Sequence, residues 1–407
     1  MTGSGGRPAT YREVFAVAEF RALFAAQLLS VIGDQFARVA LMVLVFEWTG
    51  SAGLAALTYA LTFLPDIAGG PLLSGLADRY PRRAVMVVTD LARAGLVVIM
   101  AVPGVPFVVL CALLVAVQLL NSPFGAARAA TLPAVLAGDR FVLGSAIHNT
   151  TVQLAQVLGF AGGGAVVGWL GPSQVLLLDA VTFMASAALI RFGVRARRLP
   201  LRPTGDGGWL AGLRAGTFLV WRDRRLRSLV ALACVAGFYV TAEGLAVPYA
   251  HQIGGGAATA GLLLAAMPIG TAAGMLVLGR FVRPRTRLRL LGPMAVAACA
   301  PLTLCAFGPG LPVTFALWAL AGAASAYHMV ASAAFVRAVP DHGRGQAFGL
   351  AVTALRVSQG SGVLAAGLAA EHASPGLVLA VAGGVGMLAA ALAGRAWRAT
   401  HPGGAYE

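Results

Sequence analysis

Charged side chains are scarce in this chain of 407 residues: Asp, Glu, Lys and Arg together make up 11%, and hydrophobic residues make up 58%. The surface of a soluble domain needs more charge than this, so the mean hydropathy of +0.81 excludes a soluble globular protein. Apolar runs of about 20 residues, each long enough to cross a bilayer as a helix, recur along the whole chain. These runs do not alternate between apolar and polar residues, which excludes a transmembrane β-barrel.

The apolar runs predict an all-α integral membrane protein with twelve transmembrane helices. The polar loops between the runs are short and blur their ends, so each boundary is placed to within about four residues. The predicted helices span 22–46, 53–77, 84–102, 107–130, 144–168, 174–191, 228–250, 258–281, 290–307, 313–335, 346–370 and 376–394.

Lysine is absent, and all 30 basic side chains are arginines. Most of the arginines lie in the terminal segments and in every second loop. The loops between these contain no arginine. The loops without arginine lie near 47–52, 103–106, 169–173, 251–257, 308–312 and 371–375. The positive-inside rule therefore places both termini in the cytoplasm, and we expect a multi-pass protein of the cell's inner (plasma) membrane. The net charge of +15 sits in short membrane-flanking segments, so we expect no nucleic-acid partner.

Cysteine is also scarce, and the sequence lacks the motifs of several enzyme classes. The four cysteines lie within apolar segments without metal-ligand spacing, so we expect no disulfide framework, no metal and no cofactor. Neither a Walker sequence nor H-E-x-x-H nor G-x-S-x-G is present, so ATP-driven and hydrolytic chemistry lack support. We do not expect an enzyme.

The longest polar stretch, 191–227, divides the chain into two parts. We expect an N-terminal six-helix half at 1–192, a cytoplasmic linker with an interfacial helix at 193–227, and a C-terminal six-helix half at 228–407. The alternative, that the end of this linker helix extends the seventh span, stays open. A shift of 204 residues lays GPLLSGLADRYPRR over GMLVLGRFVRPRTR, which indicates that the halves are related. One class of transporters is built from two related halves with the substrate site between them.

The run SGLADRYPRR, between the second and third predicted helices, resembles the G-x-L-A-D-R-x-G-R-R motif of the major facilitator superfamily. Ser74 and Pro81 replace the two glycines of that motif. SPFGAARAATLPAVLAGDR and the IGD of the first helix resemble the drug and siderophore exporter branch. GFAGGG resembles an antiporter element, with Phe160 in place of its proline. The resemblance covers the whole chain and implies the major facilitator fold.

In that superfamily the loop carboxylate, here Asp78, contacts the cytoplasmic end of the eleventh helix and helps to close the inside. The eleventh helix begins near Gly345, where free N–H groups and the helix dipole stabilise a carboxylate. The loop arginines also meet the anionic inner leaflet. The alternative is that this basic loop only sets the topology. The predicted gate residues are Ser74, Gly75, Asp78, Arg79, Arg82 and Arg83.

Charges within a membrane span are costly, so each is a functional hypothesis. The resemblance places the first and seventh helices around the transport cavity, which makes Asp34 and Glu243 the candidates for proton coupling. Arg38 follows Asp34 at i+4, and a permanent ion pair between them is the alternative. Glu243 has no basic residue within one helical turn, which favours a protonatable role.

Asp66 and Arg356 lie at similar depths in the second and eleventh helices, which pack together in the resembled fold. We expect them to form a charge pair that acts as a gate. The alternative is that Arg356 binds an anionic substrate. Asp90 and Arg93, at i and i+3, are expected to form a structural pair. Further polar residues that could line the pathway or pack in the core are Arg38, Arg128, Gln156, Tyr239 and His328.

We therefore expect a proton-coupled exporter, an antiporter of small amphipathic or hydrophobic compounds, which works by alternating access as a monomer in the lipid bilayer. Its partners would be a small-molecule substrate, protons and lipid. An uptake symporter for a small nutrient is one alternative, but a polar nutrient would need several fixed polar anchors. A receptor or scaffold that does not transport is the other, against which the repeat and the buried charges count.

Overall fold

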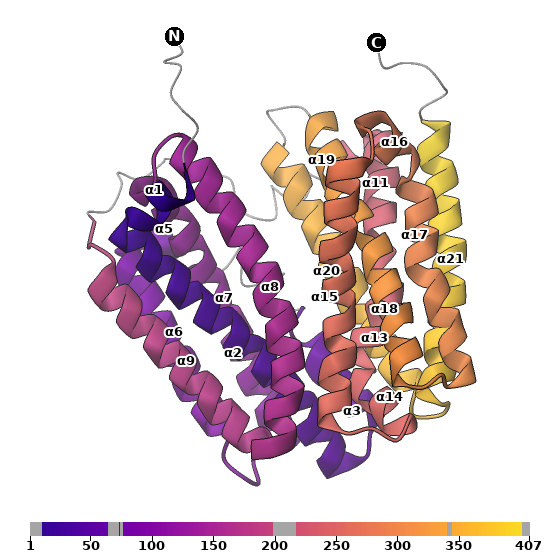
Figure 1. The fold of residues 1–407 in the computed structure, drawn as a ribbon, viewed down its shortest axis with the longest axis horizontal. Coiled ribbons are helices and arrows are strands. Elements are labelled where there is room, and N and C mark those ends of the chain that lie inside the picture. The colour runs from indigo at the N-terminus through magenta and orange to yellow at the C-terminus, as the bar shows by residue number, and fades with distance from the viewer. Residues whose placement is uncertain (1–9, 64–72, 74–75, 198–216, 340–343, 401–407) are drawn as a thin grey trace. The chain divides into compact units, whose positions relative to one another are not determined.

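The computed structural model describes residues 10–63, 73, 76–197, 217–339 and 344–400, and the regular elements among them are helices (Figure 1). Eight segments of this described part are long and apolar enough to cross a membrane. The prediction of an all-α integral membrane fold is therefore confirmed.

The described helices overlap the predicted spans, and part of the second predicted span, 53–77, lies outside the described residues. Before the linker they are α1 (Tyr11–Ala16), α2 (Ala18–Thr49), α3 (Ala52–Ala60), α5 (Leu76–Arg79), α6 (Arg82–Met100), α7 (Phe107–Val135), α8 (Asp139–Leu170) and α9 (Pro172–Gly193). After it they are α11 (Arg224–Cys234), α12 (Ala236–Tyr239), α13 (Thr241–Gly244), α14 (Ala246–Gln252), α15 (Ala257–Phe281), α16 (Pro284–Arg289), α17 (Leu291–Cys299), η1 (Ala300–Phe307), α18 (Leu311–Ser325), α19 (Tyr327–Ala338), α20 (Arg344–Ala369) and α21 (Pro375–Ala399).

Helix starts follow local chemistry. α3 begins after Gly50, whose φ of 65° suits glycine, and the Ser51 hydroxyl accepts a hydrogen bond from the Leu54 amide at 3.0 Å. α11 begins after Asp223, whose carboxylate accepts from the Arg225 amide at 2.7 Å. Residues 217–222 are helical, and Asp223 separates them from α11. The rest of the predicted interfacial helix lies outside the described residues.

Three predicted spans are helices with internal breaks. The seventh, 228–250, is divided into α11, α12, α13 and α14 by turns at Val235, Val240 and Leu245. The ninth continues from α17 into the 3₁₀ helix η1, and the tenth is divided into α18 and α19 at Ala326. Breaks of this kind in a long helix often mark functional positions.

The described chain forms two compact units. Unit 1 contains 10–37, 76–159 and 173–197, and unit 2 contains 38–63, 160–172, 217–339 and 344–400. The boundaries of these units fall within α2 and α8, so they differ from the division at 192 and 228, which stays a prediction.

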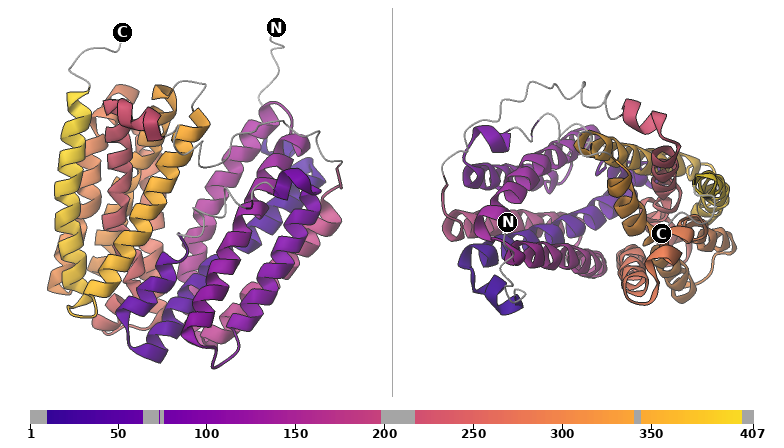
Figure 2. Two further views of the ribbon diagram at one scale, coloured as in Figure 1. Left: turned by 180° about the vertical axis from the view of Figure 1, so that it is seen from behind. Right: turned by 90° about the horizontal axis from the view of Figure 1, so that it is seen from above.

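Each unit is a bundle of helices that lie side by side, which appear nearly end-on in the right-hand view of Figure 2. In unit 1, Leu23, Met86, Phe124 and Ile190 bring α2, α6, α7 and α9 into one apolar core. In unit 2, glycines allow close packing: a Cβ on Gly270 would lie 1.9 Å from the backbone oxygen of Ala319. Small residues at the α15–α18 contact therefore bring two backbones together, as is common between helices in membranes.

Candidate functional site

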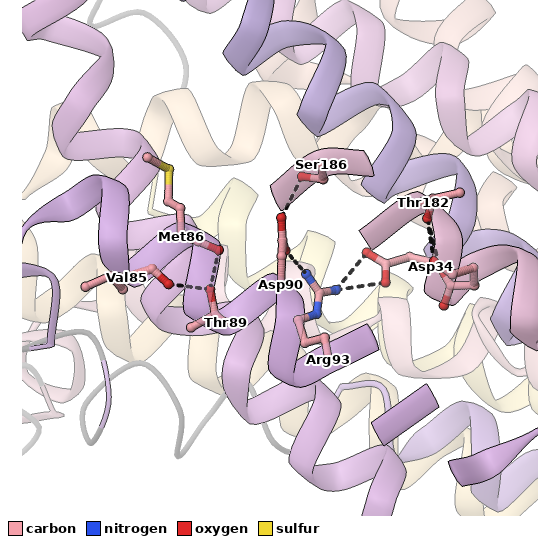
Figure 3. A network of polar contacts seen from close by, with 9 residues as sticks. Asp34, Val85, Met86, Thr89, Asp90, Arg93, Thr182 and Ser186 are labelled. Carbon is pink, nitrogen blue, oxygen red and sulfur yellow. Dashed lines mark hydrogen bonds and ion pairs between the residues drawn. The ribbon is translucent and has the colours of Figure 1, made fainter. Parts of the chain in front are cut away.

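A buried ionic cluster joins α2, α6 and α9 in unit 1 (Figure 3). We call Asp34, Asp90, Arg93 and Asp179 the Arg93 cluster. Arg93 Nη2 donates to both carboxylate oxygens of Asp34, at 2.9 and 3.2 Å, and Arg93 Nη1 lies 3.6 Å from Asp90 Oδ1. The second oxygen of Asp90 accepts from the Ser186 hydroxyl at 2.6 Å. The guanidinium also lies 4.0 Å from the centre of the Phe183 ring, a cation–π contact.

Gly33, the central residue of the IGD stretch, allows α9 to approach this cluster. A Cβ at Gly33 would lie 2.2 Å from the Thr182 hydroxyl oxygen and 2.3 Å from Asp179 Oδ1. Thr182 in turn donates to the Asp179 backbone oxygen at 2.8 Å and lies 3.2 Å from Asp179 Oδ1. Only a residue without a side chain fits between these atoms.

The Arg93 cluster has more acidic than basic groups. The guanidinium of Arg93 pairs with the carboxylates of Asp34 and Asp90, and the Arg93 and Asp90 side chains are 0% exposed. The third carboxyl group, that of Asp179, lies beside Thr182. At 3.6 Å the Arg93–Asp90 contact is an ion pair that is too long for a hydrogen bond, so Asp90 Oδ1 has no donor among the described residues. Asp34 differs, since its side chain is 26% exposed. Asp34 is therefore the member of this ion pair that solvent or a substrate can reach.

These contacts bear on two ion pairs considered from the sequence, Asp34 with Arg38 and Asp90 with Arg93. Among the ion pairs of the described residues, Asp34 pairs with Arg93 of α6 and not with Arg38 of its own helix. The expected Asp90–Arg93 pair is present, but it is one edge of a larger cluster. Sequence reasoning did not connect Asp34 to Arg93, because the two residues are 59 positions apart.

A second acidic centre lies in unit 2, where the Tyr59 hydroxyl of α3 donates a hydrogen bond to Glu243 of α13. Tyr59 is 2% exposed and Glu243 is half-buried. No ion pair of the described residues includes Glu243, although the charge of Arg38 acts on it electrostatically. The buried Nε of Arg38 has no hydrogen-bond partner within the described chain. Within the described part of the chain, the Glu243 carboxyl group therefore has one neutral hydrogen-bond donor and no ion-pair partner.

The break in the seventh span positions Glu243 and is stabilised by two distant side chains. The turn at Val235 weakens the helical hydrogen bonds of the preceding carbonyl groups, which need other donors. The Tyr327 hydroxyl donates to the Leu232 oxygen at 2.7 Å, and the Ser358 hydroxyl donates to the Cys234 oxygen at 2.6 Å. α19 and α20 thus hold the broken helix in place.

Arg356 lies beside the second span. Its guanidinium is 5.6 Å from the centre of the Phe63 ring, and its Nη1 donates to Gln359 Oε1 at 3.4 Å. Phe63 precedes Asp66 by three positions in the sequence. Asp66 itself lies outside the described residues, so the Asp66–Arg356 pair stays a prediction.

An apolar cavity of about 240 Å³ lies between α11, α19 and α20 in unit 2. His328 is the ionisable residue that lines it, and the buried Nε2 of His328 has no hydrogen-bond partner within the described chain. The His328 ring packs against Tyr327, with centroids 4.5 Å apart, and against Tyr239, at 6.2 Å. The remaining lining residues are Leu229, Val230, Ala233, Ala331, Ser332, Phe335, Phe348, Ala351, Val352 and Leu355.

Part of the predicted cytoplasmic gate lies outside the described residues, namely Ser74, Gly75 and the side chain of Asp78. Arg79 is exposed. Arg82 Nη1 donates to the Ala130 oxygen at 2.6 Å, and Arg83 Nη1 donates to the Val194 oxygen at 3.3 Å. Both arginines are half-buried, so they tie the loop to α7 and to the end of α9, a role that the sequence did not reveal.

The other predicted polar residues are placed as follows. Arg128 Nη1 lies 3.2 Å from His148 Nδ1, which joins α7 to α8 in unit 1. Gln156 is half-buried on α8. Sequence reasoning missed a further contact in unit 2, between Glu371 and the start of α3, because a carboxylate in a loop gave no signal.

Comparisons with known proteins agree with the fold. The family model of the Major Facilitator Superfamily matches residues 23–308 and, in a second match, residues 244–405. The chain is 25% identical over 387 residues to the uncharacterized MFS-type transporter YvqJ of Bacillus subtilis (strain 168), with 91% of this chain and 90% of that protein covered. It is 27% identical over 376 residues to the multidrug efflux pump Tap of Mycolicibacterium fortuitum, with 86% and 88% covered. A solved structure of a bacterial homologue of the iron transporter ferroportin, in an inward-facing state, aligns with a TM-score of 0.71 at 16% identity and covers 94% of this chain and 98% of that one.

Proposed function

This chain belongs to the major facilitator superfamily, and we propose that it is a proton-coupled exporter of small amphipathic or hydrophobic compounds that works by alternating access. We place it in the plasma membrane as a monomer, with both termini in the cytoplasm. The likeness to the multidrug efflux pump Tap supports export over uptake. The arginine-free outer loops support the orientation.

The observation that carries the proposal is the Tyr59–Glu243 hydrogen bond. A carboxyl group with one neutral donor and no bound counterion can accept a proton and release it without separating an ion pair. A proton on Glu243 and a substrate near the broken seventh span would then stabilise different conformations, which is the requirement for exchange. Tyr59 acts in this proposal as a positioning residue.

Asp34 is the second candidate for proton coupling. Its cluster holds more carboxyl groups than guanidinium groups, so a proton bound there reduces the repulsion among them. The partial exposure of Asp34 supports access to that proton. The bond from Arg93 opposes this role, because Asp34 must give up part of an ion pair when it is protonated.

The cavity beside His328 supports the substrate class. Its lining is almost entirely apolar, with one unpartnered ring nitrogen, which suits a hydrophobic compound with a single hydrogen-bonding group. A polar nutrient would leave its own polar groups unpaired there. This argues against the uptake alternative.

We also propose that Asp66 and Arg356 form a gate and that Asp78 helps to close the cytoplasmic side. The position of Arg356 against Phe63 supports the first proposal, since Asp66 follows Phe63 three positions later in the sequence. A double-mutant cycle tests it: Asp66→Ala and Arg356→Ala should each impair transport, and the double variant should be no worse. Strictly additive losses, with no rescue by the charge swap, would show that the residues act separately.

Dye accumulation in an efflux-deficient bacterium tests the function itself. Cells that express the protein should accumulate less ethidium and rhodamine 6G than cells without it, and a protonophore should remove the difference. The Glu243→Gln variant should behave like cells without the protein, whereas Glu47→Gln, the same change at an exposed carboxyl group, should not. Greater accumulation in expressing cells would indicate uptake, and no change with correctly inserted protein would contradict transport of such compounds.

A further inference from the structure

A groove of about 630 Å³ lies in unit 2, where α11, α16, α19 and α21 meet, and none of its lining residues belongs to either acidic centre. We call it the arginine groove. It is lined by Arg225, Pro284, Arg285, Arg287, Leu288, Met329, Val330, Ala333, Ala334, Arg337, Ala338 and Trp397. The predicted topology places these segments on the cytoplasmic side, where most of the arginines lie.

Among the described residues, the groove lining contains four arginines and no acidic side chain. None of the ion pairs of the described residues involves Arg225, Arg287 or Arg337. Arg287 is fixed in place, because its Nε donates to the Val282 oxygen at 2.8 Å and its Nη2 donates to the Gly279 oxygen at 2.9 Å. Like charges gathered in one groove raise its potential and attract an anion.

The rest of the groove is apolar. Met329, Val330, Ala333 and Ala334 of α19 line it, and Met329 is 37% exposed. Trp397 of α21 is 6% exposed, and its indole N–H donates to the Leu288 oxygen at 3.1 Å. The bonded indole nitrogen fixes the ring against α16. The groove therefore offers a ligand both guanidinium groups and an apolar surface.

We propose that the arginine groove binds an anionic phospholipid of the inner leaflet, with the phosphate on the arginines and the glycerol and first acyl carbons on the α19 surface. Guanidinium groups match phosphate oxygens in geometry, and clusters of arginine at the cytoplasmic surface attract anionic headgroups. The apolar lining favours a lipid over free phosphate, because a free ion would leave that hydrocarbon exposed to water. The proposal does not depend on the transported substrate or on proton coupling.

Native mass spectrometry of the purified full-length protein tests the assignment, with phosphatidylglycerol as the probe and phosphatidylcholine as the neutral comparison. The double variant Arg225→Gln/Arg337→Gln should bind phosphatidylglycerol about tenfold more weakly or worse. The control, Arg227→Gln/Arg289→Gln, removes the same charge from exposed arginines that do not line the groove, and it should change binding less than about twofold. Both variants should unfold at the wild-type temperature in phosphatidylcholine nanodiscs, which excludes misfolding as the cause.

Two further experiments distinguish a bound phospholipid from a free phosphate ion. Ala333→Phe fills the apolar side of the groove and should weaken phosphatidylglycerol binding without any loss of charge. Inorganic phosphate at millimolar concentration should not displace the lipid. Equal losses in the groove and control variants would show diffuse attraction and overturn the proposal. Displacement by inorganic phosphate, together with no effect of Ala333→Phe, would show a free-anion site and overturn it as well.

Discussion

The Glu371 carboxylate accepts hydrogen bonds from the Ser51 hydroxyl and the Gly53 amide, both at 2.6 Å, and so joins the loop after α20 to the start of α3. Gly53 permits this contact, because a Cβ there would lie 3.0 Å from the carboxylate and 3.3 Å from the Gly367 oxygen. The same helices carry Tyr59 and Arg356 further along. The contact therefore joins the loop after α20 to the start of α3, the helix that carries Tyr59 of the Glu243 centre.

The first prediction concerns pH. The Ser51 hydroxyl and then the Gly53 amide hold the pKa of Glu371 below its usual value, so the contact is complete above about pH 5 and is lost as the pH falls through that lowered pKa. Glu371→Gln should lower the midpoint of thermal unfolding at pH 7 by a small amount, on the order of 1 °C, because the group is exposed. The difference should shrink as the pH falls through the lowered pKa and vanish once Glu371 is protonated in the folded protein. A difference that grows on acidification would contradict the contact.

The second prediction concerns the fit of α9 against α2. Gly33→Ala places a Cβ against Thr182 and Asp179, so it should destabilise the protein by about 1–3 kcal/mol, measured by thermal unfolding in detergent. Gly95→Ala is the matched control, since a Cβ at Gly95 meets no atom within 4 Å. Adding Thr182→Ala should recover part of the Gly33→Ala loss. Equal unfolding midpoints for the two single variants would disprove the close approach.

The third prediction concerns the charge balance of the Arg93 cluster. Arg93→Gln leaves buried carboxylates without a counterion and should cost about 3–5 kcal/mol of unfolding free energy. The double variant Arg93→Gln/Asp34→Asn should recover part of this loss because it removes one of the unpaired charges. Arg79→Gln, at an exposed position, should be neutral. Wild-type stability of Arg93→Gln would mean that the cluster is not ionic.

The fourth prediction concerns the break in the seventh span. Ser358→Ala removes the donor to the Cys234 oxygen and should cost about 1–2 kcal/mol. Ser361→Ala removes a hydroxyl from the same helix that bonds within its own helix, so it should cost less than about 0.5 kcal/mol. Thermal unfolding of the two variants gives the comparison. A larger loss for Ser361→Ala would contradict the role assigned to Ser358.

The positions of the spans could be predicted because hydrophobicity is a local property. α7 begins at Phe107, where the sequence placed it, and α15 ends at the predicted residue, Phe281. The breaks could not be predicted, because the donors to Leu232 and Cys234 come from residues about a hundred positions away. The charges themselves were evident in the sequence. The partner of Asp34 was not, because it depends on how α6 packs against α2.

Proton-driven transport by purified protein in liposomes shows whether Glu243 carries the coupled proton. With an imposed pH gradient, the wild-type protein and Glu47→Gln should move ethidium against its concentration gradient at similar rates. Glu243→Gln should retain ethidium binding but lose uphill transport, because its amide cannot exchange the proton that the Tyr59-bonded carboxyl group carries. Uphill transport at the wild-type rate by Glu243→Gln, and also by Glu243→Gln combined with Asp34→Asn, would contradict the account.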